Sequence, residues 1–181
     1  MGLPRAPLPA ALVTSVIYRD DSRRDLAIRL LGDRFGQGDV HGDPIPFDQT
    51  SYYQAEMGSP LKRVFWTARR PVERDGLAAI KLASNEIEQS LAAGGGARTV
   101  NLDPGLLSAE NFVLATTKNF AHRICLGRGI FAEITLIYRG SSYEPLPWTY
   151  PDYAGEVIRN ILKQLRNNYI RGIREIASGN P

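Results

Sequence analysis

The order of the apolar patterns along the first 103 residues constrains the fold more than any other feature of this chain. Residues 12–18, LVTSVIY, are rich in β-branched side chains and predict a strand. The next segment, SRRDLAIRLLGDRFG, has the apolar spacing of a helix, with Ser22 as the expected N-cap and Gly36 at its end. VHGDPIPFD then predicts a short extended segment, and its prolines place it at a sheet edge.

Three further elements complete this first half. Residues 61–69, LKRVFWTAR, predict a strand, and residues 71–93 predict a helix with Pro71 near its first turn and three glycines after its end. ARTVNLD predicts a fourth strand, which leads into a tight turn, DPG, at 103–105. Strand, helix, strand, strand, helix, strand is the ferredoxin-like βαββαβ order, an α+β fold with an antiparallel sheet and both helices on one face.

The second half of the chain extends this core. NFVLATTKNF is ambiguous between helix and strand, whereas HRICLGRGIFAEITLIY predicts a β-hairpin. YAGEVIRNILKQLRNNYIRGIREIAS predicts an amphipathic C-terminal helix. The apolar side of that helix is formed by Val157, Ile161, Leu165, Tyr169, Ile173 and Ile176. We expect a single domain over 1–181, with the ferredoxin-like core at 12–103 and the hairpin plus C-terminal helix at 111–181.

Composition excludes several classes of protein. Hydrophobic residues make up 43% and charged residues 23%, which is typical of a folded globular protein. The net charge of +3 permits an anionic ligand but does not require nucleic acid. The single cysteine, Cys125, cannot form an intrachain disulfide and suits the cytoplasm, where we expect the protein. There is no run of 18 apolar residues, so no membrane partner is expected; a homo-oligomer stays open.

One row of polar side chains lies beside the apolar stripe of the second predicted helix. Helical spacing places Lys81, Asn85 and Glu88 within reach of one another. Such a row can contact a ligand at the sheet edge, and the alternative is an ordinary surface pair between Lys81 and Glu88. The stripe itself is formed by Leu77, Ile80, Ser84, Ile87 and Leu91.

The predicted hairpin brings two titratable residues together. A two-residue turn at Gly127 and Arg128 has glycine in the first central position, as a type II′ turn requires. The register that follows places His122 opposite Glu133 on one face. A carboxylate beside an imidazole suits acid–base catalysis or metal binding, and the alternative is a buried histidine paired with an acid.

Other candidate site residues lie at the ends of predicted elements. Asp103 is a third catalytic candidate, and Asn101 beside it is a candidate ligand contact. Asp103 could also bind a divalent metal, which we leave open as a cofactor. The alternative is that Asn101 and Asp103 bond their own turn. The stiff loop LPWTYPDY is either a structural plug or a rigid pocket wall with stacking rings. Its candidate ligand contacts are Trp148, Thr149, Tyr150 and Asp152, and the candidate cations for anionic groups are Arg63, Lys81, Lys118 and Arg123.

The usual phosphate-binding and metal-binding motifs are missing. The sequence contains neither GxxxxGK[ST] nor GxGxxG nor HExxH, and the three glycines at 94–96 end a helix rather than open one. An alternative without a pocket is a nucleic-acid or protein interaction module. It would use the basic side of the C-terminal helix, formed by Arg159, Lys163, Arg166 and Arg174.

Five ordered phrases resemble a bacterial family, domain-of-unknown-function family 4416. They are YYQAEMG, RTVNLDPG, LATTKNFAHRI, GRGIFAEITLIY and PWTYPDY, and the similarity runs from about Leu12 to Tyr169. Family members carry the label "GTP-binding protein", so the resemblance implies nucleotide binding. Family members tend to have the sequence TTKD, whereas this chain has Asn119 in place of the final Asp, after Lys118. They also tend to have Tyr at the positions of Leu106 and Cys125.

A P-loop GTPase is excluded, because the phosphate loop and the guanine-binding acid are both missing. We expect a protein that binds a nucleotide-like or phosphorylated small molecule, and turnover of that molecule stays open. Whether the chain is an enzyme stays open at this point.

Overall fold

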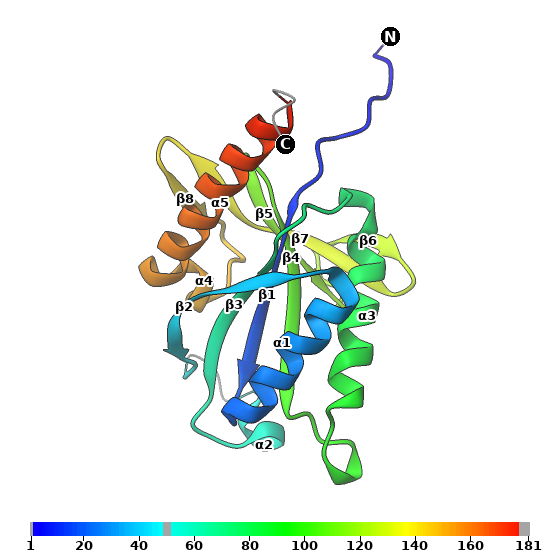
Figure 1. The fold of residues 1–181 in the computed structure, drawn as a ribbon, viewed down its shortest axis with the longest axis vertical. Helices are drawn as coiled ribbons and strands as arrows, with labels where there is room; N and C mark the ends of the chain where they lie inside the picture. Colours follow the sequence, from blue (N-terminus) through cyan, green and yellow to red (C-terminus); the bar gives the residue numbers. More distant parts are fainter. Residues whose placement is uncertain (1, 49–51, 178–181) are drawn as a thin grey trace.

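A computed structural model describes residues 2–48 and 52–177 of the chain (Figure 1). In this part of the chain, one antiparallel sheet of eight strands has the order β2-β3-β1-β4-β5-β7-β6, and β8 pairs with β7. The strands are β1 (Ala11–Tyr18), β2 (Gly38–Pro46), β3 (Lys62–Ala68), β4 (Val100–Leu107), β5 (Asn111–Thr116), β6 (Ile124–Gly127), β7 (Ile130–Arg139) and β8 (Ser142–Pro145). The α-helices are α1 (Asp21–Phe35), α2 (Gln54–Met57), α3 (Leu77–Ser90), α4 (Pro151–Ala154) and α5 (Glu156–Ala177). The fold is therefore α+β, and its sheet is larger than predicted.

Helices α1 and α3 lie side by side over one face of the sheet (Figure 1). Leu12 and Val16 of β1 point to this face and pack against Leu31 of α1 and Ile87 of α3. All five residues of the predicted α3 stripe are buried, which confirms the helical spacing.

The ends of these two helices differ from the prediction. Helix α1 begins one residue before Ser22, and its N-cap is Asp20, whose carbonyl accepts the N–H groups of Arg23 and Arg24. Helix α3 begins at Leu77, and Pro71 lies outside it, because the chain first pairs Val72 with Ala10 in an isolated bridge.

Helix α5 covers the opposite face of the sheet. Val13 and Phe65 point to this face and share a core with Leu162 and Leu165 of α5. The hydroxyl of Tyr169 donates to the carbonyl of Pro9 over 2.7 Å, which ties the helix to the segment before β1. None of the described helices is long and apolar enough to cross a membrane.

The predicted apolar side of α5 needs one correction. Val157 is 59% exposed, and Ile158 is buried in its place. Val157 lies in the first turn of the helix, where the sheet-facing side is taken by the neighbouring residue. The side chain of Ile176 lies outside the described residues.

The predicted turn at 103–105 is wrong, because these residues lie inside β4. Pro104 lies opposite Thr14 of β1, and β4 pairs with β5 only from Gly105 to Leu107. Proline has no N–H to donate, so it is tolerated where a strand has no partner on that side. The ambiguous segment that follows forms strand β5.

The predicted hairpin exists, but its predicted register is wrong. The two turn residues are Arg128 and Gly129, with φ of 55° and 76°. Positive φ at both central positions defines a type I′ turn in place of the predicted type II′ turn. Cys125 therefore lies opposite Phe131, and the register shifts once more before Gly127.

Candidate functional site

The main cavity lies where β4 and β5 separate. The residues of β4 that precede Gly105 do not pair with β5, and side chains from α3 reach the gap between the two strands. The cavity has a volume of about 760 Å³. Its lining includes ten of the thirteen predicted site residues: Arg63, Lys81, Asn85, Asn101, Asp103, Lys118, Arg123, Glu133, Tyr150 and Asp152. His122, Trp148 and Thr149 do not line it.

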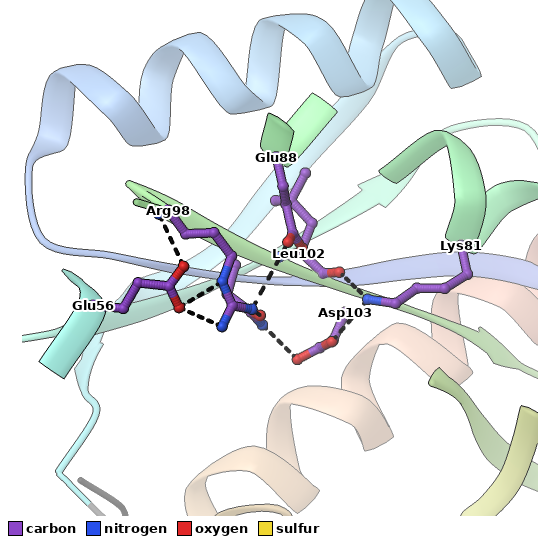
Figure 2. A network of polar contacts seen from close by, with 7 residues as sticks. Glu56, Lys81, Glu88, Arg98, Leu102 and Asp103 are labelled. Carbon is purple, nitrogen blue, oxygen red and sulfur yellow. Dashed lines mark hydrogen bonds and ion pairs between the residues drawn. The ribbon is translucent and has the colours of Figure 1, made fainter. Parts of the chain in front are cut away.

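Two charged side chains of α3 bind the free edge of β4. The Lys81 ammonium donates to the carbonyl of Leu102 over 2.8 Å, and Glu88 accepts the N–H of the same residue over 2.6 Å (Figure 2). Both side chains are almost fully buried. They replace the hydrogen bonds that a neighbouring strand would have made. The two residues are thus not the surface pair that the sequence left as an alternative.

A polar network continues from Lys81 across the cavity wall (Figure 2). Lys81 forms an ion pair with Asp103 at 3.1 Å, and Asp103 accepts a hydrogen bond from Asn101 at 2.7 Å. Arg98 donates to Asn101 and, through two nitrogens, to Glu56 of α2. Asn101 and Asp103 therefore bond side chains rather than their own turn.

Two members of this network, Glu56 and Arg98, are not among the residues that the sequence predicted for the site. Glu88 was predicted only as part of the helix row with Lys81 and Asn85. The pair of Arg98 and Glu56 joins residues 42 positions apart, and no local spacing indicates it.

Burial and charge change the acidity of several groups in this network. Burial raises the pKa of Glu88 to about 7, although Lys81 and the N–H of Leu102 oppose the shift. The hydrogen bonds from Arg98 lower the pKa of Glu56. Burial also raises the pKa of Tyr53, whose ring lies 5.3 Å from the guanidinium of Arg98. Glu88 is thus a cavity-lining carboxyl whose pKa burial raises toward neutral pH.

A second cluster surrounds the buried Glu133. Its carboxylate accepts a 2.7 Å hydrogen bond from Arg123 and contacts Nε2 of His122 at 3.1 Å. The predicted contact between His122 and Glu133 is present, but His122 reaches it from a turn before β6 and not from an opposed strand position. The His122 ring stacks on Trp148 with an interplanar angle of 9°. Glu133 lines the cavity, whereas His122 lies outside it.

Arg123 connects two loops at the cavity wall. Besides Glu133, its guanidinium donates to the carbonyl of Lys118 and to the hydroxyl of Tyr150, each over 2.9 Å. The exposed ammonium of Lys118 lies 4.0 Å from the centre of the Tyr52 ring. Arg123 therefore places one cation and one aromatic ring against the cavity.

The loop at 146–153 has two roles. Trp148 donates to the carbonyl of Ile134 over 2.8 Å, and Thr149 donates to the carbonyl of Thr135 over 2.5 Å, so this half fixes the loop to β7. Tyr150 and Asp152 line the cavity from the other half. The two interpretations of the loop, plug and pocket wall, thus apply to different residues.

Asp152 forms an ion pair with the buried Arg63, whose Nη2 lies 2.6 Å from the carboxylate. The Arg63 guanidinium lies 4.7 Å from the centre of the Phe47 ring and 5.0 Å from that of Tyr153. Cations are stabilised on ring faces, so these two aromatic side chains help to hold it.

Metal ligation has little support in the described parts of the chain. Residues 2–48 and 52–177 contain no group of three or more His, Cys, Asp or Glu side chains that could hold a metal ion. The predicted catalytic roles of His122, Glu133 and Asp103 stay predictions.

These features define an α+β protein with one antiparallel sheet and a charged cavity where two of its strands separate. The chain belongs to the family described as Domain of unknown function (DUF4416), whose sequence pattern matches residues 8–169. No curated protein and no solved structure gives a significant match.

Proposed function

We propose that the protein binds a small anionic molecule, nucleotide-like or phosphorylated, in the main cavity, and that it does so without a P-loop. A volume of about 760 Å³ lies within the usual range for small-ligand sites. The glycines at 94–96 form a 3₁₀ turn before a strand, so they do not open a helix onto a phosphate.

The charge of Lys118 is the observation that carries this proposal. Each of the other lining cations faces a carboxylate, in the pairs Arg63–Asp152, Lys81–Asp103, Arg98–Glu56 and Arg123–Glu133. Lys118 faces the ring of Tyr52, and it forms no ion pair with a carboxylate in the described parts of the chain. A cation without an acid at the wall of a cavity favours an anionic ligand.

Aromatic rings beside Lys118 support a ligand with a planar part. Tyr52, Tyr53 and Tyr150 line the cavity, and Tyr52 packs edge-on against Tyr53 at 5.0 Å. Aromatic side chains stack on bases without regard to base identity. We therefore favour a nucleotide-like ligand over a simple phosphorylated sugar.

A thermal-shift comparison of nucleosides with their mono-, di- and triphosphates tests the proposal. A nucleotide at about one hundred times its Kd should stabilise the fold by about 2.7 kcal/mol, which raises the Tm by roughly 5–10 °C. The matching nucleoside should have a much smaller effect, because it has no charge for Lys118. Lys118→Ala should remove most of the nucleotide effect, and Lys163→Ala on α5 is the matched control.

Two results would contradict the proposal. One is a panel in which no nucleotide or phosphorylated compound raises the Tm. The other is an equal rise in Tm with nucleosides and nucleotides, or an equal rise with a nucleotide in wild type and in Lys118→Ala. In either case Lys118 would contribute nothing to binding.

We also propose that β1 to β4 with α1 and α3 form a ferredoxin-like core. The strand order β2-β3-β1-β4, antiparallel throughout, supports this assignment. The shared core of α1 and α3 on one face supports it as well.

The interaction-module alternative has no observation of its own that favours it. Two side chains of its basic surface bind carbonyl groups within the protein, Arg159 that of Tyr143 and Arg166 that of Ala109. These two arginines are therefore not free to bind nucleic-acid phosphates.

A further inference from the structure

A second cavity adjoins the main one at the ion pair of Arg63 and Asp152. Its volume is about 240 Å³, and it shares Phe47, Arg63, Pro151 and Asp152 with the main cavity. The rest of its wall comes from Ile45 and Pro46 of β2 and from residues 155–158 at the start of α5. Arg63 thus borders both cavities.

Arg63 keeps hydrogen-bonding capacity that the described residues do not use. It is 3% exposed, and its Nε–H has no hydrogen-bond partner among them. A guanidinium has five N–H donors, and the ion pair with Asp152 occupies one side of it. Because a buried donor without an acceptor is costly, such a group favours an anion that brings additional acceptor oxygens.

The first turn of α5 supplies a second set of donors at the same place. The first backbone hydrogen bond of α5 runs from the N–H of Arg159 to the carbonyl of Gly155, over 3.1 Å. The N–H groups of Glu156, Val157 and Ile158 precede it and have no acceptor within the helix. With 22 residues, α5 also has a full dipole, whose positive end lies at these groups.

Two carboxylates border this cavity and limit the affinity for an anion. Asp152 is already bound, by Arg63 and by the N–H of Tyr153 at 2.8 Å. Glu156 is exposed, so water and salt screen its charge. Asp152 offsets the charge of Arg63, so the positive potential at this cavity comes mainly from the first-turn N–H groups of α5. The charge of Glu156 opposes that potential, and it can be removed by substitution.

We propose that the second cavity is a phosphate subsite, in which Arg63 and the first-turn N–H groups of α5 bind a phosphoryl group. The volume is enough for one phosphate with a few water molecules, since one water takes about 30 Å³. The inference deepens the proposed function and rests on it only for the part of the ligand in the main cavity. A ligand that reaches both cavities then carries two separate anionic groups, one at Arg63 and one at Lys118.

Inorganic phosphate alone is the probe that tests the subsite. Phosphate at millimolar concentration should broaden in ³¹P NMR with wild type, and chloride or acetate at equal ionic strength should not compete. Val157→Pro removes one N–H while proline stays compatible with a first helical turn. It should weaken phosphate binding about ten-fold, because hydrogen bonds to ionised groups are the strong ones. Val157→Ala keeps the N–H and is the matched control.

A second variant should strengthen phosphate binding rather than weaken it, so a loss of structure could not explain the expected result. Glu156→Gln should tighten phosphate binding about two- to five-fold, by removing a negative charge beside the positive end of the helix. Equal phosphate affinity in Val157→Pro and Val157→Ala would overturn the subsite, as would the absence of any broadening with wild type, or displacement by acetate.

The two proposals fail in different ways. Nucleotide binding that needs Lys118, together with no binding of inorganic phosphate, would leave the proposed function and remove the subsite. Phosphate binding that responds to Val157→Pro, without stabilisation by any nucleotide or phosphorylated compound of the panel, would leave the subsite and remove the proposed function.

Discussion

Glu88 combines a structural bond with an unusual acidity. It accepts the N–H of Leu102 at 2.6 Å, and burial raises its pKa to about 7, while Lys81, Arg98 and Asp103 are the charged groups that face it. The folded protein therefore keeps a proton on Glu88 at pH values where the unfolded chain, with an ordinary pKa of 4.5, has lost it. The stabilising contribution of this protonation is complete below pH 4.5 and is lost as the pH rises to 7.

Glu88→Gln tests this acidity, because glutamine keeps an acceptor for Leu102 and cannot ionise. The variant should equal wild type in unfolding free energy near pH 4.5 and exceed it by roughly 3 kcal/mol at pH 8, from a shift of about 2.5 units. Urea unfolding of both proteins from pH 4 to 8 measures the difference. A difference that does not change with pH would show that Glu88 ionises normally.

Single residues were predictable from the sequence where local spacing decides their position. The row of Lys81, Asn85 and Glu88 follows from helical periodicity, and all three line the cavity. The ion pair of Arg63 and Asp152 joins β3 to α4, and no pattern in either segment indicates the other. Contacts of this kind depend on the tertiary fold, which the sequence pattern does not specify.

Strand β4 shows how an element can contradict its own local pattern. The letters DPG are typical of a tight turn, yet Asp103 and Pro104 continue the strand opposite β1. Pairing with β1 along the whole of β4 outweighs the local preference, and the missing N–H of Pro104 falls where β5 has already separated. The fork between β4 and β5, by which we mean the separation of the two strands before Gly105 that forms the cavity, therefore could not be predicted from these letters.

Gly105 marks the last paired position of this fork, and it has no room for a side chain. A Cβ there would lie 2.7 Å from the Phe112 ring and 2.8 Å from the carbonyl oxygen of Val113. Gly105→Ala should therefore destabilise the protein by about 1–3 kcal/mol, because either the ring or the β5 backbone must move. Chemical denaturation measures this loss.

The matched control is a glycine with free space in a helix. A Cβ at Gly32 of α1 meets nothing within 4 Å, so Gly32→Ala should stabilise the protein by about 0.5–1 kcal/mol. Unchanged stability in Gly105→Ala would mean that β4 and β5 can separate further without cost, and that the fork is not rigid.

At the scale of the whole molecule, two cores share the strands of one sheet. Leu12 of β1 belongs to the core under α1 and α3, and Val13, the next residue, belongs to the core under α5. Phe65 and Trp66 of β3 divide in the same way. The sequence pattern predicted α1, α3 and α5, but not that α5 covers the opposite face, because periodicity identifies the apolar side of a helix and not its partner.

Because the strands are shared, we expect the two cores to unfold together as one cooperative unit. Trp66 is 1% exposed in the core under α1 and α3, and Trp148→Phe leaves it as the only tryptophan. In that background Leu162→Ala, which opens a cavity under α5, should cost about 2–5 kcal/mol. The Trp66 fluorescence midpoint should fall together with the circular dichroism midpoint, and Leu31→Ala under α1 should shift both in the same way. If Trp66 kept its original midpoint in Leu162→Ala while the circular dichroism midpoint fell, the α5 layer would be unfolding separately, and the single-domain prediction would be wrong.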